Sequence, residues 1–475
     1  MPPRVVENTP YYETEQWPGP LSLSNVSTST DDIITKHISS IDSAECDLYS
    51  EDGVWIVDFN IINNQLERWQ RLLPRVKLFY AVKTNPDPEL LKYLSSHPMK
   101  IRFDCASHSE ISQILSLSVP SDDIIYANPC KAPSHIRYAA INNVKKMTFD
   151  NLTELYKIKH HFPTAECILR FKVSEPTPCD DPSEGAMYEL SKKYGVTIDY
   201  SREILLHAKR LGLNVVGLAF HVGSGQRNVR TYKDHIQEAR RIWEIAGQVG
   251  FSFTLLDIGG GFMYSNFEKA ANAVNAALDS EFGDLIERGE VDIVAEPGRY
   301  VSAPAFTLLT SVIAVKGETE DVGEKRMVYL ADGFYSNLQG AYWPGELTAP
   351  TVVRGKRLYT PKSTLPTSSA SSDSGIEVGD QIEDGDNASV DDQEGGVATL
   401  MRGDLQEYTV WGPTCDCMDV VLEDALLPKG IEVGDWFVFK DLGAYSNCTR
   451  TKFNGFRMSH KTYYIHDHGV DIGVI

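Results

Sequence analysis

The sequence predicts an α/β protein: a (β/α)8 barrel followed by an all-β C-terminal domain. Short apolar runs rich in β-branched and aromatic residues recur through about the first 300 residues. Most of these runs are separated by amphipathic stretches of helical period. From about residue 305 the long helical patterns give way to β-like runs and turns. An open doubly wound sheet is the alternative architecture for the first part.

Eight apolar runs are expected to be the barrel strands. They are 78–82, 101–103, 124–127, 146–149, 167–172, 215–220, 254–258 and 292–295. The stretches between them include 151–162 and 231–250, which have the spacing of amphipathic helices. Eight strands alternating with helices over about 240 residues fit a (β/α)8 barrel, which we place at residues 46–305.

The predicted β-sheet domain occupies residues 306–475. Its strand candidates are the runs "FTLLTSVIAV", "RMVYLADGFY", "GDWFVFKDLG" and "KTYYI". The run "GVWIVDF" (53–59), just before the barrel, is also expected to be a strand, one that joins this second domain.

Two segments are predicted to be disordered. Residues 1–45 mix Pro, Ser, Thr and Asp and have the composition of an N-terminal tail. Residues 363–399 are rich in Ser, Gly and acidic residues and contain no aromatic residue. Such a composition cannot bury enough apolar surface to offset the entropy of ordering, so 363–399 is interpreted as an acidic insertion in the β-sheet domain.

The composition argues against several kinds of partner and location for this protein. A net charge of −21 over 475 residues argues against nucleic acid or an anionic membrane surface. No apolar run approaches the roughly 20 residues that span a bilayer, and the polar, proline-rich amino terminus lacks the apolar core of a secretory signal. Eight scattered cysteines show no metal-binding spacing, so we expect no metal site and a reduced, cytoplasmic setting.

Polar residues follow nearly every predicted barrel strand. In a (β/α)8 barrel the chemistry lies at the carboxyl ends of the strands. The residues found there are Lys83, Asp104, Asn128, Asp150, Arg170, His221, the triplet Gly259 to Gly261, and the element Glu296-Pro297-Gly298-Arg299. Each is a weak signal alone, but together they predict one binding or catalytic site.

The residue types in this set point to pyridoxal 5'-phosphate. Lys83, in "FYAVKTN", is either a solvated strand end or an amine that forms a Schiff base with a carbonyl. The glycine triplet lets backbone N–H groups approach an anion, and Arg299 offers a fork for the same phosphate. His221 and Ser224, in "HVGSG", supply a ring for stacking and a hydroxyl.

Glu296 is the most informative residue of the set. A carboxylate beside a pyridine nitrogen keeps that nitrogen protonated, and the resulting pyridinium withdraws electrons from a developing carbanion. The alternative is a surface carboxylate that pairs with Arg299 nearby.

Long motifs then resemble a known family, eukaryotic ornithine decarboxylase of the alanine-racemase-like fold type. They are "PRVKLFYAVKTN", "FDCASHSEI", "IIYANPCK", "MTFD", "FHVGSG", "LLDIGGGF", "AEPGRY", "WGPTCDCMD" and "GAYSNCTRTKFNGF". The resemblance runs from about Trp55 to Phe456, interrupted by the acidic insertion. It implies a pyridoxal phosphate enzyme that forms an obligate head-to-tail homodimer with two active sites shared across the interface.

The resemblance also assigns roles, motif by motif. Lys83 would hold the cofactor covalently and His221 would stack on its ring. The phosphate would be held by Ser224, Gly260, Gly261, Arg299 and Tyr445, with Pro297 and Gly298 in the same element, and the ring nitrogen by Glu296. Supporting polar residues would be Asp104, Glu110 and Arg170.

The remaining roles fall in the second domain. Cys415 would reach in from the partner subunit to donate a proton to Cα; otherwise it is a buried, inert thiol. Asp416 and Phe453 would line the substrate side-chain pocket. Lys193 and Asp419 could form an intersubunit salt bridge.

The chain departs from the family pattern at the substrate end of the site. Ornithine decarboxylases carry a Tyr-Asp pair whose aspartate grips the distal ammonium of the substrate. In "ADGFYSNLQGAYWPGEL" that pair falls on Trp343-Pro344, or on Tyr342-Trp343 after a one-residue shift. Either Glu346 or Asp416 substitutes for the aspartate, or the substrate has a bulkier or less basic side chain. The sequence "GGGFMY", where the family has "GGGFPG", is a second departure.

The predicted function is pyridoxal-phosphate-dependent decarboxylation of an L-amino acid. The substrate is L-ornithine, which gives putrescine, or a related basic or non-proteinogenic amino acid, as in polyamine or fungal alkaloid-type specialised biosynthesis. Two alternatives are a catalytically impaired regulator like antizyme inhibitor and a diaminopimelate- or lysine-type decarboxylase. A racemase fits less well, because those enzymes place arginine at the ring nitrogen.

Overall fold

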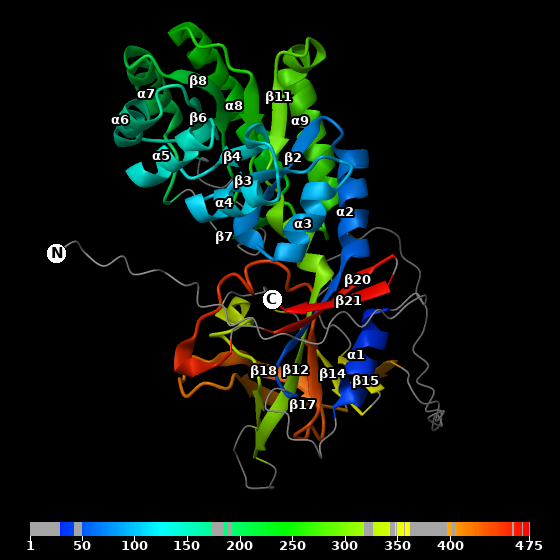
Figure 1. Cartoon of the computed structure of the whole chain (residues 1–475). Helices are drawn as coiled ribbons and strands as arrows, with labels where there is room; N and C mark the ends of the chain where they lie inside the picture. The colour runs from blue at the N-terminus through cyan, green and yellow to red at the C-terminus, as the bar shows by residue number, and fades with distance from the viewer. Residues whose placement is uncertain are drawn as a thin grey trace, which may run out of the picture.

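The computed structural model describes residues 29–41, 50–172, 185–188, 192–317, 326–342, 347, 349–355, 357–361, 397–400, 404–457, 460–467 and 469–474. A closed barrel of eight strands lies above an 11-stranded sheet (Figure 1). The predicted barrel with a C-terminal β-domain is therefore confirmed, and the alternative open doubly wound sheet is wrong.

The eight barrel strands overlap the eight predicted runs. In order around the barrel they are β2 (Val76–Ala81), β3 (Arg102–Cys105), β4 (Ile124–Tyr126), β5 (Lys146–Phe149), β6 (Glu166–Arg170), β8 (Asn214–Ala219), β10 (Leu255–Asp257) and β11 (Asp292–Ala295). Neighbours are parallel, and β11 pairs with β2 to close the ring. Side chains alternate between the two faces: Phe79 packs in the barrel interior, whereas Tyr80 joins the core under the helices.

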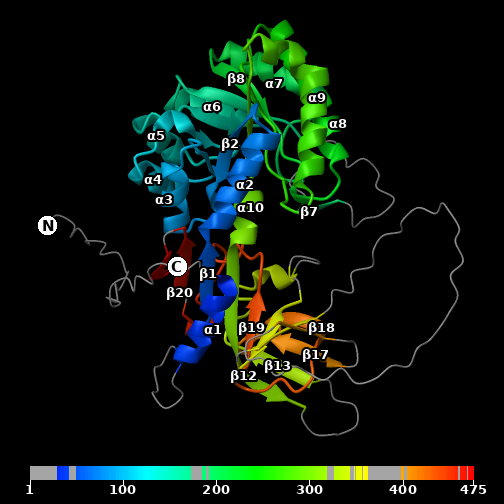
Figure 2. The same cartoon turned by 90° about the vertical axis from the view of Figure 1, so that its right-hand side faces the viewer.

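Helices surround the barrel (Figures 1 and 2). They are α2 (Phe59–Leu72), α3 (Pro88–Ser96), α4 (His108–Ser116), α5 (Pro133–Ile141), α6 (Leu152–His161), α7 (Ile198–Arg210), α8 (Arg230–Val249), α9 (Phe267–Glu287) and the short α10 (Gly298–Ser302). Local sequence sets their ends. The Asp87 side chain caps α3, with Pro88 in the first turn, and Gly250 ends α8 at a φ of +93°.

The β-domain is built from both ends of the chain. Its strands are β1 (Val54–Asp58), β12 (Phe306–Lys316), β13 (Arg326–Leu330), β14 (Thr351–Arg354), β15 (Arg357–Pro361), β16 (Val397–Leu400), β17 (Leu405–Trp411), β18 (Val420–Pro428), β19 (Trp436–Phe439), β20 (Lys461–His466) and β21 (Gly469–Val474). As expected for the run before the barrel, β1 lies between β12 and β20, antiparallel to the first and parallel to the second.

The predicted disordered tail was wrong for one helix, α1 (Thr30–Ser40). Ser29 and Asp32 form a capping box at its start, and Ile33 and Ile34 are buried against the β-domain. The polar average composition of residues 1–45 concealed this short amphipathic segment. Residues 1–28 and 42–49 lie outside the described residues, as does the predicted insertion up to residue 396. Its last three residues begin β16.

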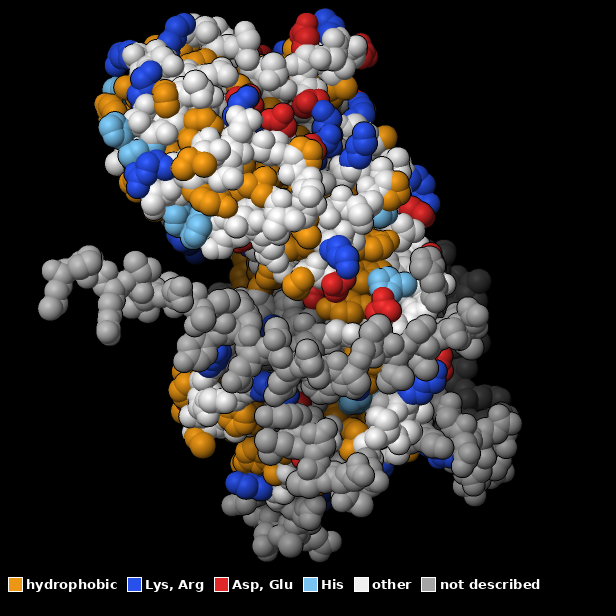
Figure 3. Space-filling view, in the orientation of Figure 1, with side chains coloured by type: hydrophobic (Ala, Val, Ile, Leu, Met, Phe, Trp, Pro, Cys, Tyr) orange, Lys and Arg blue, Asp and Glu red, His pale blue; other side chains and the backbone are white. Residues whose placement is uncertain are grey.

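Every helix among the described residues is too short or too polar to cross a lipid bilayer. The visible face of the barrel mixes Lys and Arg with Asp and Glu side chains (Figure 3). Part of the net charge of −21 lies in the predicted insertion, which contains nine acidic residues and no Lys or Arg. The negative charge is therefore distributed unevenly along the chain.

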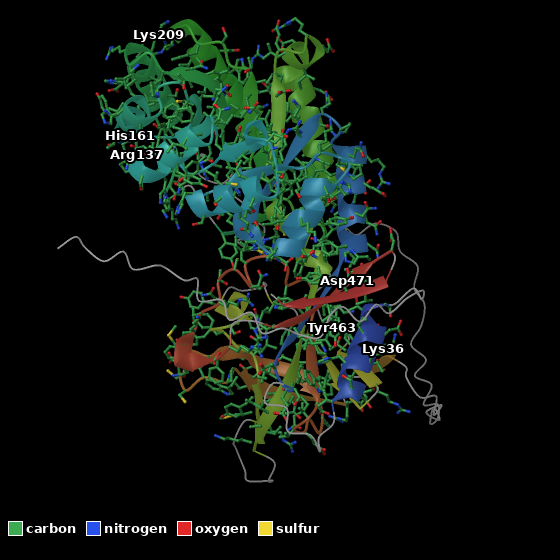
Figure 4. All side chains as sticks on the ribbon, in the orientation of Figure 1. Lys36, Arg137, His161, Lys209, Tyr463 and Asp471 are labelled. Carbon is green, nitrogen blue, oxygen red and sulfur yellow. The ribbon has the colours of Figure 1, made fainter. Side chains whose placement is uncertain are left out.

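His37 holds α1 against the β-domain as a neutral group. Its side chain is 7% exposed, its Nδ1 lies 3.1 Å from the Tyr463 hydroxyl, and its ring makes an edge contact with Trp436. Figure 4 shows Tyr463 on β20 next to the helix that carries Lys36. Burial, together with the nearby Lys461 charge, lowers the pKa of His37 to about 4.

The docking of α1 should therefore weaken in acid. The unfolded state takes up the imidazole proton near pH 6.5, but the docked state resists it down to about pH 4, so stability is complete above about pH 6.5 and declines below it. At about pH 5 the loss should be of order 2 kcal/mol. Hydrogen exchange of the α1 amides measures it. His37→Gln, which does not titrate, should remove the effect; an equal pH dependence in both proteins would contradict this origin.

Candidate active site

The site lies where the carboxyl ends of the barrel strands meet a loop of the β-domain, residues 441–448. Tyr445 in this loop donates its backbone N–H to the Thr84 carbonyl at 3.0 Å. The Asn85 side chain donates to the Gly443 carbonyl at 3.1 Å, and that of Asn447 donates to the Asn85 side chain at 2.9 Å. The loop is thus fixed to the two residues that follow Lys83.

Lys83 lies in the short 3-10 helix Val82–Thr84 that follows β2, and it forms an ion pair with Asp104 near the end of β3. The Asp104 side chain is fully buried, and that of Lys83 is one-third exposed (33%). Burial disfavours the ammonium form of Lys83, but the Asp104 and Glu296 carboxylates outweigh it and raise the lysine pKa above its usual value. The alternative of a solvated strand end is therefore wrong. Lys83 must lose a proton before it can attack a carbonyl, and Asp104 is placed to accept it.

The Asp104 carboxyl is itself shifted toward its protonated form. Burial and then the Glu296 charge raise its pKa, and Lys83 and Arg170 only partly offset them, so the pKa lies at about 7. The raised pKa of Lys83 keeps the proton on the amine in this ion pair, and the raised pKa of Asp104 makes transfer to its carboxylate less unfavourable than transfer to an ordinary aspartate.

Two further acids lie beside this pair. Burial and the neighbouring Asp257 charge raise the pKa of Glu296 to about 8, although Lys83 and Arg170 oppose the shift. Burial likewise raises the pKa of Asp257 to about 6, and its Oδ1 accepts the Gly259 N–H at 2.9 Å. Glu296 is only 8% exposed, so its alternative role as a surface carboxylate is wrong. A cation beside Glu296 would favour the ionised form of this pair.

Five residues form what we call the anion cradle: Ser224, Gly260, Gly261, Arg299 and Tyr445. Arg299 donates its Nε–H to the Ser224 hydroxyl at 3.1 Å, and its Cζ lies 5.2 Å from the Tyr445 ring centroid. A Cβ on Gly260 would lie 2.8 Å from both the Glu296 carbonyl and the His221 ring, so only glycine fits there.

The element Glu296 to Arg299 is packed as tightly as the cradle. A Cβ on Gly298 would lie 2.1 Å from the Thr84 hydroxyl, beside Lys83. Pro297 immediately precedes α10, whose first residues are Gly298 and Arg299. The ring-nitrogen candidate and the phosphate candidate therefore sit on one rigid turn.

His221 presents a neutral ring to the site. Its Nδ1 accepts the Gly223 N–H at 3.0 Å, and burial, with the Arg170 and Lys83 charges, holds its pKa well below the usual value. Arg170 ends β6 and acts on its surroundings through charge. Glu110, on α4, accepts the Ala106 N–H at 2.6 Å and thereby supports the loop after Asp104.

Two of the predicted strand-end residues form hydrogen bonds with the backbone of nearby loops. Asp150 accepts the Gly195 N–H at 2.8 Å, and the Asn128 side chain donates to the Ala106 carbonyl. These hydrogen bonds stabilise the chain around the site.

The remaining residues at the barrel end fit pyridoxal 5'-phosphate. Lys83 offers an amine for its aldehyde, and Glu296 a buried carboxyl for the ring nitrogen. His221 offers a neutral ring surface, and the anion cradle a place for the phosphate. A cationic ring nitrogen would also relieve the repulsion that raises the Glu296 pKa.

A second cluster lies on the β-domain. Cys415 and Asp416 occupy the loop between β17 and β18, and the Cys415 N–H donates to the Asn454 side chain at 3.0 Å. The Tyr335 hydroxyl donates to Asp416 at 2.5 Å, and Phe453 stacks on the Tyr335 ring at 4.5 Å. From the sequence, Cys415, Asp416 and Phe453 were assigned to the substrate end of the site, and the structure brings these three residues into one cluster. Cys415 is exposed, so the alternative of a buried, inert thiol is wrong.

The predicted substrate contacts of Tyr342, Trp343 and Pro344, and the predicted Lys193–Asp419 salt bridge, stay predictions. Trp343 and Pro344 lie outside the described residues, and Tyr342 is 63% exposed. Asp419 is fully buried and accepts the Phe334 N–H, the Thr414 N–H and the Thr414 hydroxyl within its own chain. Its salt bridge with Lys193 of a partner subunit stays a prediction.

Asp257 and Tyr335 were not among the site residues predicted from the sequence. Asp257 is the last residue of a buried apolar strand, and an acid in that position was itself a signal. Tyr335 lies in "ADGFY", where only its contact with Asp416, 81 positions away, gives it a role.

In the second departure from the family pattern, Met263-Tyr264, the tyrosine makes two hydrogen bonds of its own. The Tyr264 hydroxyl donates to Asp441 at 2.9 Å, and its carbonyl accepts from Arg68 at 3.0 Å. Tyr264 follows the glycine triplet, and Asp441 begins the loop that carries Tyr445. This hydrogen bond therefore links the barrel segment that carries Gly260 and Gly261 to the β-domain loop that carries Tyr445. We call these two segments the two halves of the anion cradle.

Comparisons with known proteins agree with this geometry. The family model described as pyridoxal-dependent decarboxylase, pyridoxal binding domain, matches residues 60–303. The chain is 37% identical to ornithine decarboxylase of Schizosaccharomyces pombe over 413 residues, 87% of this chain and 83% of the relative. It is 36% identical to decarboxylase flvG of Aspergillus flavus over 414 residues, 86% of this chain and 85% of the relative.

Solved structures are similar over almost the whole chain. The arginine decarboxylase of Paramecium bursaria Chlorella virus, bound to agmatine, superposes with a TM-score of 0.73 at 27% identity, covering 92% of this chain and 100% of that chain. A lysine/ornithine decarboxylase of Vibrio vulnificus, complexed with cadaverine, gives 0.68 at 26% identity with the same coverage.

Tyr264→Phe should loosen the connection between the two halves of the cradle. It removes one hydrogen bond to a partly buried carboxylate, so the free energy of unfolding should fall by about 0.5–1 kcal/mol. Denaturant unfolding measures the change. Tyr156→Phe, on the exposed face of α6, is the matched control and should change nothing. Equal values for both variants would show that the Asp441 contact contributes no stability.

Proposed function

Because the chain belongs to the ornithine decarboxylase family of pyridoxal-dependent decarboxylases, we propose that it removes the α-carboxyl group of a basic L-amino acid as CO2. The observation that carries this proposal is the convergence of Lys83, Glu296 and the anion cradle at one end of the barrel. A regulator without activity is a poorer interpretation, because the amine, the acids and the cradle are all retained.

Each residue of the site would have a separate role in the proposed decarboxylation. Pyridoxal phosphate, when bound, supplies an aldehyde that condenses with amino groups and a ring that withdraws electrons from the α-carbon. Lys83 would hold that aldehyde, and Asp104 would accept the proton that the ammonium must lose. Glu296 would keep the ring nitrogen protonated, while His221 and the cradle fix the orientation. Orientation matters because it would decide which bond to the α-carbon breaks.

The last step requires a proton at the α-carbon, and we assign its delivery to Cys415 of the partner subunit. Within one chain the described hydrogen bond of the Cys415 backbone is to Asn454 of the same domain, and its thiol is exposed. The same loop exposes Met418 (55%), with Phe453 nearby (41%). Exposed apolar groups around a reactive thiol suit an interface in a homodimer with shared active sites. A reduced, cytoplasmic setting would keep this thiol competent.

The substrate side chain would meet the cluster of Tyr335, Asp416 and Phe453. Asp416 already accepts the Tyr335 hydroxyl, and the stacked rings give this pocket an apolar wall. We therefore propose a basic or non-proteinogenic amino acid whose side chain is bulkier or less basic than that of ornithine. Ornithine itself, with putrescine as product, is the alternative. Relatives named for arginine, lysine and ornithine show that substrate length varies within this fold.

Mixed dimers test the shared sites. Lys83→Ala should abolish turnover and the visible absorbance of the Schiff base, and Cys415→Ala should lower product formation while leaving that absorbance intact. Half of randomly mixed dimers contain one intact site of two, so mixing the two variants should restore about a quarter of wild-type activity.

The mixed-dimer experiment tests the roles of Lys83 and Cys415 separately. Retained turnover in Lys83→Ala would overturn the role of the lysine. No recovery on mixing, with dimers seen by light scattering, would place Cys415 in the site of its own chain or outside both sites. Each variant taken through the same mixing procedure alone is the control, and it should show no gain in activity.

A substrate panel tests the specificity. The wild-type enzyme should have a low kcat/KM for ornithine compared with a longer or less basic amino acid. Trp343→Asp or Pro344→Asp, which restores a carboxylate, should raise kcat/KM for ornithine about 10-fold or more. Trp343→Asn is the uncharged control. High kcat/KM of the wild type for ornithine would refute the altered specificity while leaving the decarboxylase assignment intact.

A further inference from the structure

A short strand, β7 (Ala186–Tyr188), lies over the anion cradle. It pairs antiparallel with β9 (Ser224–Gln226), and Tyr188 is the register partner of Ser224. Figure 2 shows β7 at the end of the barrel that faces the β-domain. The strand therefore brings a tyrosine next to the hydroxyl that accepts from Arg299.

The glycines of "HVGSG" make room for this strand. A Cβ on Gly223 would lie 2.6 Å from both the Ala186 Cβ and the Tyr188 carbonyl. A Cβ on Gly225 would lie 2.6 Å from the Met187 sulfur. Both glycines have positive φ, +96° and +66°, which other residues rarely adopt. The close seating of β7 is thus built into the motif itself.

Arg299 lies within reach of two aromatic rings. Its Cζ is 5.8 Å from the Tyr188 ring centroid and 5.2 Å from that of Tyr445, and the two rings are 6.3 Å apart. Both distances from the guanidinium are within the roughly 6 Å of cation–π contacts. A third contact, from Nε to the Ser224 hydroxyl, fixes one edge of the guanidinium.

We propose that Tyr188 is a positioning residue for the cofactor: its ring holds the Arg299 guanidinium in the orientation that binds the phosphate. This inference rests on the proposed function, in which Arg299 is a phosphate ligand. A guanidinium held before the ligand arrives loses less rotamer freedom on binding, so its affinity for phosphate is higher. The ring is the part that matters, because cation–π attraction comes from the face of the aromatic system.

The test uses the full-length enzyme freed of cofactor, with pyridoxal phosphate and pyridoxal as probes. Tyr188→Leu, which removes the ring, should raise the Kd for pyridoxal phosphate about 2- to 5-fold. Tyr188→Phe, which keeps the ring, should leave it unchanged. Pyridoxal, which has no phosphate, should bind equally to all three proteins. Tyr156→Leu is the matched control at an exposed position on α6.

Each other outcome overturns the inference. An unchanged Kd in Tyr188→Leu means that the ring does not position Arg299. A rise for both probes indicates general damage to the site, and a rise in Tyr188→Phe assigns the effect to the hydroxyl. Arg299→Ala separates this proposal from the function. If that variant weakens pyridoxal phosphate and Tyr188→Leu does not, only the role of Tyr188 fails; if Arg299→Ala has no effect, the phosphate assignment fails as well.

Discussion

The pairing of Lys83 with buried carboxylates is the interaction on which the rest of the site depends. Placing a charge in a protein interior costs several kcal/mol unless an opposite charge compensates it. Lys83 and Arg170 partly compensate Asp104 and Glu296, but burial and then the neighbouring carboxylates still raise the pKa values of the two acids to about 7 and about 8. Four residues from four strand ends must therefore meet within one pocket, which a closed barrel achieves by bringing all its strand ends to one rim.

The β-domain is part of this pocket rather than an appendage. Leu442 and Gly443 donate their backbone N–H groups to the Phe306 and Ala303 carbonyls, and a Cβ on Gly443 would lie 1.8 Å from the Ser302 carbonyl. Such close backbone contact leaves the loop that carries Tyr445 little freedom. The strand β1, held between β12 and β20, leads directly into α2 of the barrel. The relative position of the two domains, and with it the anion cradle, is thus set from both sides.

Barrel strands and strand-end residues were predictable because each strand is an apolar run whose end is marked by a polar group. Contacts that join distant positions were not: Asp257 looks like part of its strand, and Tyr335 meets Asp416 only after folding. Helix α1 was hidden because composition averages over residues 1–45, whereas the capping box of Ser29 and Asp32 is a local signal. Sequence patterns over long windows predict the main strands and helices. Short helices such as α1 and contacts within the site depend on single hydrogen bonds, which such patterns do not reveal.

In the proposed substrate pocket, one hydrogen bond fixes the charge of Asp416. The bond from Tyr335 lowers the pKa of Asp416, which therefore stays ionised, and raises that of Tyr335 to about 12, so the hydroxyl keeps its proton. One carboxylate oxygen accepts this hydroxyl and the other accepts the Met418 N–H. A distal ammonium must share these oxygens with donors already in place, so it gains less than from a free aspartate. Contact with the Phe453 and Tyr335 rings then weighs more, which favours substrates that bring apolar surface along with their charge.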